Sequence, residues 1–187
     1  MKRCQWVPEK DALYCAYHDK EWGVPIHDDR QLFEFLILET FQAGLSWKTV
    51  LYKRDSFRKA FAGFDPVKVA AFTEKDEQRL LNDSGIIRNR LKIKAAISNA
   101  HAFLKVAREI GSFDKYIWGF VDNKPIDNQW RGLSDIPAKT QLSDQVSADL
   151  KKRGFKFVGS TTIYAHMQAV GMVNDHTLDC FRHRQLC

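Results

Sequence analysis

The chain of 187 residues fits a single domain, and 44% hydrophobic residues are enough for an ordinary core. No apolar run approaches the roughly 20 residues of a membrane span, and the opening MKRCQWVPEK lacks the apolar stretch of a secretory signal. We therefore expect a cytoplasmic protein with no membrane contact. The net charge of +6 favours a polyanionic partner, although charge alone is a weak indication.

The first 27 residues differ from the rest of the chain. The run CQWVPEKDALYCAYHDKEWGVPIHDD is rich in Trp, Tyr, His and Cys and shows little periodicity. No amphipathic face can therefore order it, and we expect an irregular segment. A metal tied to the far end of the chain would hold such a segment in place.

From Asp28 onward the pattern is helical almost without interruption, and it predicts an all-α fold without a convincing strand ladder. Caps, proline and helical spacing define the expected elements. In chain order these are a helix in QLFEFLILETF capped by Asp28 and Asp29, a helix in SWKTVLYKRDSFRKAF capped by Ser46, a short helix in DPVKVAAF led by Pro66, a helix in EQRLL with a Thr73–Asp76 capping box, a long helix after Ser84 and Gly85, and helices in LSDQVSADLKKR, after Gly159 and near His176. The segment NKPIDNQWRGLSDIPAKT, broken by two prolines and a glycine, is expected to be a surface connection.

Two basic clusters interrupt this pattern. They are Arg88, Arg90, Lys92 and Lys94 in IIRNRLKIK, and Lys151, Lys152, Arg153 and Lys156 in KKRGFKF. Either cluster is a solvated helix face or a DNA-binding surface, and the crowding around a glycine favours DNA for the second. A basic helix end, a turn bounded by Gly154 and Gly159, and a new helix at Ser160 or Thr161 form a helix-hairpin-helix pattern, whose free N–H groups can bind a phosphate. Such hairpins also occur as plain helix connections.

Four residues at the two ends of the chain form a candidate metal site. Cys4 and His18 with His176 and Cys180 make a Cys2His2 set suited to tetrahedral zinc, with no open position for catalysis. The spacing of His176 and Cys180 places both on one face if that segment is helical. Rival ligands remain, namely His27, His183, Cys15 and Cys187, and the alternative is buried cysteines with helix-capping histidines.

Glu39 is the candidate functional carboxylate. It falls at i+7 from Leu32 on the face that should be buried, and a buried carboxylate must be paired, protonated or used. The aromatic residues Tyr14, Tyr17, Trp22 and Trp47 lie nearby in sequence. A carboxylate among aromatic rings can hold a flat, electron-poor heterocycle by stacking and a hydrogen bond to its amino group. The alternative is an internal salt bridge within a plain aromatic core.

The turn GLSW separates the first two predicted helices. Gly44 and Leu45 precede the Ser46 cap, so an apolar side chain lies at an exposed tight turn. Leu45 is either a wedge that enters a base stack or a residue that covers the helix junction.

Taken together, these residues resemble the helix-hairpin-helix DNA glycosylases that excise 3-methyladenine. The likeness covers essentially the whole chain and is carried, in order, by RCQWV, YHDKEWGVP, ETFQAGLSW, FDPVKVA, SGIIRNRLKI, KKRGFKFVG and VNDHTLDC. It implies one glycosylase domain over residues 1–187, with a helical body over 28–173 and the hairpin near 151–171. In this arrangement a structural zinc ion clasps the 1–27 segment to the 174–187 segment.

The resemblance also implies roles for individual residues. The zinc ligands fall on Cys4, His18, His176 and Cys180, the base pocket on Glu39, Tyr17, Trp47 and Tyr14, and the DNA contacts on Gly44, Leu45, Lys156, Gly159, Ser160 and Thr161. In ETFQAG, Thr40 and Phe41 replace the Gly and Gln of the more usual EGQQAG, which bears on the shape of the pocket beside Glu39.

The implied activity is that of a bacterial base-excision-repair enzyme acting as a monomer on alkylated double-stranded DNA. It flips out 3-methyladenine and hydrolyses its N-glycosyl bond. The residues after Gly159 are Ser160, Thr161 and Thr162, without the lysine nucleophile of lyase-type relatives, so we expect an abasic product and no strand cleavage. Asp175 lies near the place of the aspartate of many superfamily members, but the resemblance gives it no role. The alternatives are a non-catalytic zinc-stabilised DNA-binding module and an enzyme with catalytic zinc.

Overall fold

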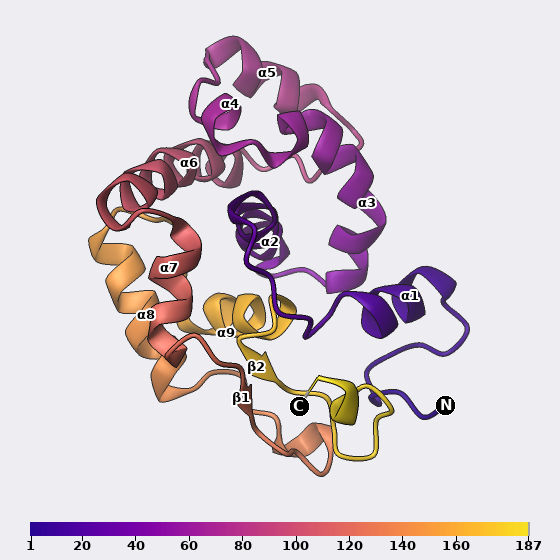
Figure 1. Ribbon diagram of the computed structural model, residues 1–187. Coiled ribbons are helices and arrows are strands. Elements are labelled where there is room, and N and C mark those ends of the chain that lie inside the picture. The colour runs from indigo at the N-terminus through magenta and orange to yellow at the C-terminus, as the bar shows by residue number, and fades with distance from the viewer. Residues whose placement is uncertain (187) are drawn as a thin grey trace.

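The protein is built around one central helix, as Figure 1 shows for the computed structural model, which describes residues 1–186. Helix α2 (Asp29–Gln42) begins at the predicted cap, where the Asp28 side chain accepts a hydrogen bond from the Gln31 N–H over 2.9 Å. All ten residues from Leu32 to Phe41 are buried. A helix that is apolar on all sides must be surrounded by other elements, and α3, α6, α7 and α9 pack against it.

The remaining elements include the other predicted helices, apart from the one near His176, together with two helices and two strands that the sequence did not predict. They are α1 (Ala12–Lys20), α3 (Trp47–Ala60), α4 (Pro66–Ala70), α5 (Glu74–Asn82), α6 (Arg90–Ile110), α7 (Phe113–Trp118), β1 (Ile126–Asp127), α8 (Gln141–Lys152), α9 (Ser160–Ala169) and β2 (Val173–Asn174), with single 3-10 turns at Ala62–Phe64, Gly119–Val121, Leu133–Asp135 and His183–Gln185. The Ser46 cap, the leading Pro66 and the Thr73–Asp76 capping box are confirmed. Within residues 1–186, no helix is long and apolar enough to cross a membrane.

The expectation of an irregular first segment was wrong over α1. Asp11 caps this helix by accepting a hydrogen bond from the Tyr14 N–H. Its buried residues are Cys15, Tyr17 and His18, none of which is aliphatic. Because this face carries a thiol and two polar-ended rings in place of aliphatic side chains, the sequence lacks the apolar stripe that predicts a helix.

The expectations about strands and about the His176 segment were also wrong. β1 and β2 form a short parallel pair in which Ile126 lies opposite Val173. Two residues a strand are too few for an alternating pattern to be visible in the sequence. The chain around His176 is not helical but turns tightly, with the Cys180 N–H bonded to the Thr177 carbonyl at 2.8 Å. The predicted surface connection therefore contains β1, and this strand docks it on the C-terminal segment.

The long helix α6 begins later than expected and places Lys92 in the interior. The Asn89 side chain caps α6 by accepting from the Lys92 N–H. The Lys92 ammonium group then reaches the C-terminal end of α2 and donates to the carbonyls of Phe41, at 2.8 Å, and Ala43, at 2.6 Å. Burial lowers the pKa of this group. The two carbonyl acceptors and the negative end of the α2 dipole replace the hydration that the ammonium group loses. Lys92 is thus a structural cap, not part of a solvated basic face.

Replacing Lys92 by methionine is expected to destabilise the protein by about 1–3 kcal/mol, because two carbonyls lose their donor. The matched change Lys94→Met, at a side chain that is 57% exposed, should cost less than about 0.5 kcal/mol. Urea denaturation of both variants measures the difference. Equal costs would show that the buried ammonium group stabilises nothing.

Candidate functional site

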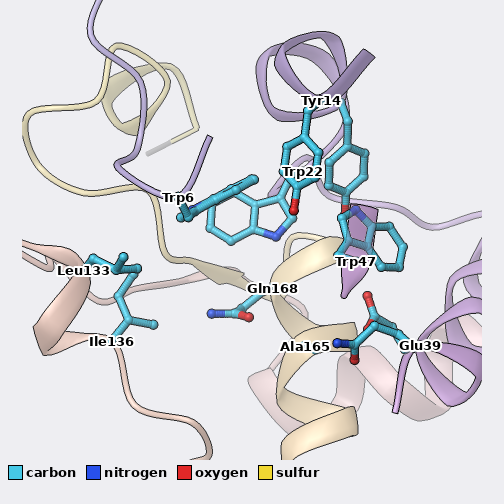
Figure 2. A pocket seen from close by; sticks show the side chains of 11 residues that line it. Trp6, Tyr14, Trp22, Glu39, Trp47, Leu133, Ile136, Ala165 and Gln168 are labelled. Atoms are coloured by element: carbon cyan, nitrogen blue, oxygen red, sulfur yellow. The ribbon is translucent and has the colours of Figure 1, made fainter. Parts of the chain in front are cut away.

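A cavity of about 290 Å³ is lined by the central helix α2, by α1, α3 and α9, by the N-terminal segment around Trp6 and by the 122–140 loop. This volume is near the lower end of the roughly 300–1,000 Å³ typical of small-molecule sites, which suits one flat heterocycle. Figure 2 shows the lining side chains, which are Trp6, Tyr14, Tyr17, Trp22, Glu39, Gln42, Trp47, Leu133, Ile136, Ala165 and Gln168. The four predicted pocket residues Glu39, Tyr17, Trp47 and Tyr14 thus meet in one place.

Glu39 has a buried carboxylate without a protein partner. It is 4% exposed, and no residue of the described chain 1–186 donates a hydrogen bond or forms an ion pair with it. Burial raises the pKa of this carboxyl to about 8. Glu34 on the same helix is nearly as buried, but it is paired with the Arg58 guanidinium at 2.7 Å. The alternative of an internal salt bridge therefore applies to Glu34 and not to Glu39, whose carboxyl group is available to a ligand.

Aromatic rings form the walls around this carboxylate. The rings of Tyr17 and Trp47 lie 5.3 Å apart at an angle of 39°, and Tyr14 stands edge-on to Trp6. Burial raises the pKa of Tyr17 well above its usual value, so its phenol stays neutral. The indole N–H of Trp47 is buried and has no hydrogen-bond partner among residues 1–186. The cavity therefore offers stacking surfaces, an orphan donor and an acidic group.

The structure adds pocket residues that the sequence did not identify. Trp22 had been noted only as a nearby aromatic residue, and Trp6, Gln42, Leu133, Ile136, Ala165 and Gln168 were missed. Trp6 has a usable signal, because it lies two positions after Cys4 in the clasped segment. Gln42 is the last residue of α2, the others come from the 122–140 loop and from α9, and no local pattern marks them.

Thr40 and Phe41 do not alter the pocket. Both are fully buried, and neither lines the cavity. The Thr40 hydroxyl donates to the Ile37 carbonyl at 2.7 Å, while Phe41 packs edge-on against Phe57. The departure at ETFQAG therefore changes the core behind α2 and not the wall in front of it.

The predicted DNA contacts lie outside the cavity, on the turn after α2 and on the hairpin. Gly44 adopts φ of 81°, a conformation that favours glycine, and this turn leaves Leu45 41% exposed. The Gln42 amide donates to the Leu45 carbonyl at 2.8 Å, so a pocket residue holds the turn. An exposed leucine on a fixed turn favours the wedge interpretation over the covering one.

Helices α8 and α9 flank the short turn at which the sequence predicts a hairpin. Asn99 binds both backbone groups of Lys156, at 2.7 and 3.0 Å, and the Ser147 hydroxyl donates to the Val158 carbonyl at 2.6 Å. These contacts fix the turn between the helices and leave Lys156 exposed. Gly159, Ser160 and Thr161 lie at the start of α9, where the first N–H groups of a helix lack internal partners. Arg153 differs from its basic neighbours because it is paired with Asp149 at 2.7 Å.

Cys4, His18, His176 and Cys180 form a buried cluster whose ligand atoms all lie within 4.8 Å of one another. The Cys180 Sγ atom is 3.4 Å from His18 Nε2 and 3.5 Å from His176 Nδ1, and the Cys4 Sγ atom is also 3.5 Å from His176 Nδ1. A tetrahedral zinc ion with bonds of about 2.3 Å to sulfur and about 2.0 Å to nitrogen separates such atoms by about 3.5 Å. The four residues therefore fit a closed metal site.

The second nitrogen of each histidine has a partner that sets the ligand atom. His18 Nδ1 is bonded to the Asp19 carboxylate at 2.8 Å, and His176 Nε2 lies 3.0 Å from the Trp22 carbonyl. This leaves Nε2 of His18 and Nδ1 of His176 as the nitrogens that could bind a metal, and each lies within 3.5 Å of the Cys180 sulfur. The contact with Trp22 also joins the cluster to a wall of the pocket.

The rival ligands that the structure describes lie elsewhere. His27 is bonded to Asp114, His183 to the His176 carbonyl, and Cys15 to the carbonyls of Pro8 and Glu9. Cys187 lies outside the described residues.

Comparisons with known proteins agree with this arrangement. The chain is 54% identical to DNA-3-methyladenine glycosylase 1 of Escherichia coli (strain K12), with 96% of each chain covered. A crystal structure of 3-methyladenine DNA glycosylase I matches with a TM-score of 0.93 and 53% identity, over 96% of this chain and 98% of that one. A variant of 3-methyladenine DNA glycosylase I in complex with 3-methyladenine matches with a TM-score of 0.93 and 39% identity, over 97% of both chains. The family model described as methyladenine glycosylase matches residues 6–183, and the chain therefore belongs to the methyladenine glycosylase family.

Proposed function

We propose that this protein hydrolyses the N-glycosyl bond of 3-methyladenine in alkylated double-stranded DNA and leaves an abasic site. The observation that carries the proposal is the unpaired Glu39 carboxylate, 4% exposed, in an aromatic cavity sized for one base. Membership of the family, and a relative whose structure holds 3-methyladenine, support the choice of base.

The chemistry follows from the charge of the lesion. Methylation at N3 gives the attached adenine a formal positive charge, which weakens its bond to the sugar and makes it a good leaving group. Little acid catalysis is needed, so the protein mainly has to extrude the base, recognise it and admit water to the anomeric carbon. Unmodified adenine is neutral and leaves poorly, and it gains no cation–π attraction in the cavity.

Each pocket residue has a defined task in this proposal. Glu39 accepts a hydrogen bond from the exocyclic amine and stabilises the cationic ring, which in turn lowers the pKa of its carboxyl. Trp47 stacks on the ring, Tyr17 reads the edge of the base, and Tyr14 shapes the wall toward the sugar. Of these, Tyr17 and Trp47 are already held against each other before any base enters.

The DNA contacts are assigned to the hairpin and the wedge. The N–H groups at Gly159, Ser160 and Thr161 and the ammonium group of Lys156 bind a phosphate without reading sequence, while Leu45 on its Gly44 turn fills the gap left by the extruded nucleotide. Serine and threonines directly follow Gly159, in place of the lysine nucleophile of lyase-type relatives, so we propose a monofunctional enzyme without lyase activity. We also propose that it acts as a monomer.

Zinc is the proposed occupant of the cysteine and histidine cluster. When bound, it would cross-link the ends of the chain and would supply no open coordination position, so its contribution is to stability. The cluster would thereby clasp residues 1–27 to residues 174–186 around the helical body of a single domain.

Incubation of the protein with methylated duplex DNA, followed by chromatography of the released bases, tests the activity. We expect free 3-methyladenine from the wild-type protein and a loss of at least about tenfold in rate for Glu39→Gln and for Trp47→Ala. A folded protein that binds DNA but releases no base would instead be the non-catalytic DNA-binding module.

The phosphate contact makes a separate prediction about salt. Lys156→Ala should reduce the slope of the logarithm of the DNA association constant against the logarithm of salt concentration by about 1. It should weaken binding to all DNA sequences equally. Lys59→Ala, which removes an exposed charge at the far end of α3, should leave the slope unchanged. Fluorescence anisotropy of labelled duplexes gives both slopes, and equal slopes for the two variants would remove the hairpin lysine from the DNA interface.

A further inference from the structure

Asp175 is a buried carboxylate that the proposed mechanism does not use. Its Oδ1 atom accepts hydrogen bonds from the Asn128 amide at 2.7 Å and the Trp130 indole at 2.8 Å. Its Oδ2 atom accepts from the Tyr164 hydroxyl at 2.6 Å and from the Gln168 amide at 2.8 Å. Four donors fill the acceptor sites of an ionised carboxylate, so Asp175 has no capacity left for a substrate.

One of these four donors belongs to the pocket. Gln168 lies on α9 and lines the cavity, and Figure 2 shows its side chain reaching in from α9 with the amide oxygen on the side of Glu39. An ionised carboxylate only accepts, so the Gln168 amide must turn its nitrogen to Asp175. Its Oε1 atom is then held toward the cavity, and no residue of the described chain 1–186 donates to it.

The chemistry of the base decides what this oxygen can bind. A 3-methyladenine attached to its sugar has N–H donors only on the exocyclic amine at C6. A 6-oxo purine carries a carbonyl oxygen there, which would be repelled by a fixed amide oxygen. An acceptor locked in place discriminates between these bases more strongly than one that can rotate.

We propose that Gln168 is a specificity-determining residue whose oxygen selects a 6-amino over a 6-oxo purine, and that Asp175 is the positioning residue that fixes this orientation. The inference rests on the proposed function, since it assumes that a 3-methylpurine enters the cavity. The Asp175 carboxylate also ties α9 to the 122–140 loop through Trp130, so the same group sets two walls of the pocket.

Binding of two free bases tests the role of Gln168. The probes are 3-methyladenine and 3-methylhypoxanthine, which differ in the amine or carbonyl at C6, and quenching of the pocket tryptophans reports the Kd of each. We expect the wild type to prefer 3-methyladenine and Gln168→Met to reduce this preference by about tenfold. Tyr164→Phe is the matched control, because it removes a donor to the same carboxylate oxygen but not the pocket acceptor, and the preference should persist.

Asp175→Asn gives a result that a merely structural role would not produce. The new amide nitrogen would donate to Gln168 Oε1, turn the glutamine nitrogen toward the cavity and shift the preference toward 3-methylhypoxanthine. If this variant does not fold, Gln168→Met and Tyr164→Phe decide alone. An unchanged ratio in Gln168→Met, with wild-type release of 3-methyladenine from methylated DNA intact, would overturn the inference and leave the proposed function standing. Failure of the wild type to bind or release 3-methyladenine would overturn both.

Discussion

Replacing Glu39 by glutamine is expected to stabilise the ligand-free protein by about 4 kcal/mol more at pH 9 than at pH 5. Burial raises the pKa of Glu39 from 4.5 to about 8 in the folded state. Between these values the unfolded chain releases a proton that the folded protein retains, so the wild type loses stability as the pH rises. Glutamine has nothing to ionise and escapes this loss.

Glu34→Gln is the matched control for this experiment. Glu34 lies on the same helix and is also buried, but its carboxylate is paired with the Arg58 guanidinium at 2.7 Å. Its replacement should therefore give no gain in stability at pH 9. Urea denaturation of the three proteins at both pH values measures the effect. A gain for Glu39→Gln that is the same at pH 5 and pH 9 would mean that the carboxyl does not titrate between them.

The raised pKa also bears on selectivity. An empty cavity holds Glu39 largely as a neutral acid near pH 7. On the proposed function, a cationic base makes ionisation of the carboxyl favourable, whereas a neutral adenine does not. Ionisation of Glu39 is thus coupled to the charge that distinguishes the lesion from the normal base.

The parts of the fold that could be predicted from sequence are those with a local physical signal. The caps at Asp28 and Ser46 and the buried run of α2 follow from backbone hydrogen bonding and apolar spacing. Glu39 was identifiable because a carboxylate on the buried face of a helix must be paired, protonated or bound to a ligand. Helix α1 had no such signal, because its buried face carries Tyr17 and His18 in place of aliphatic residues.

The other differences come from long-range contacts. Lys92 looked like a member of a basic cluster, and only the C-terminal carbonyls of α2, about 50 positions away in the chain, make it a buried cap. Gln168 gains its importance from Asp175 on a neighbouring segment. The four candidate metal ligands lie together as predicted although His176 does not lie on a helix, since a tetrahedral site requires four donors and not a particular secondary structure.

On the proposal that zinc occupies the cluster, removal of the metal is expected to weaken the base pocket together with the fold. His176 contacts the Trp22 carbonyl through Nε2 and stands edge-on to the Trp22 ring at 4.6 Å, and His18 lies 5.3 Å from the Trp6 ring. Both tryptophans line the cavity, and Tyr17 precedes His18 on α1. Loss of the ion would leave two sulfurs and two imidazoles crowded without a common partner, so one wall of the pocket would come loose.

We expect chelation of zinc or His176→Ala to lower the free energy of unfolding by about 3–5 kcal/mol, which corresponds to about 6–20 °C in Tm, and to abolish most 3-methyladenine binding. Cys15→Ala is the matched control, because Cys15 is a buried cysteine outside the cluster, and it should retain one zinc ion per chain and the binding of the base. Metal analysis, thermal denaturation and tryptophan fluorescence with 3-methyladenine measure the three quantities. If the metal-free protein melts at a lower temperature but binds the base with unchanged affinity, the cluster stabilises the fold without shaping the pocket. If both the Tm and the affinity for the base fall, the contact between the two ends of the chain is needed for recognition of the lesion.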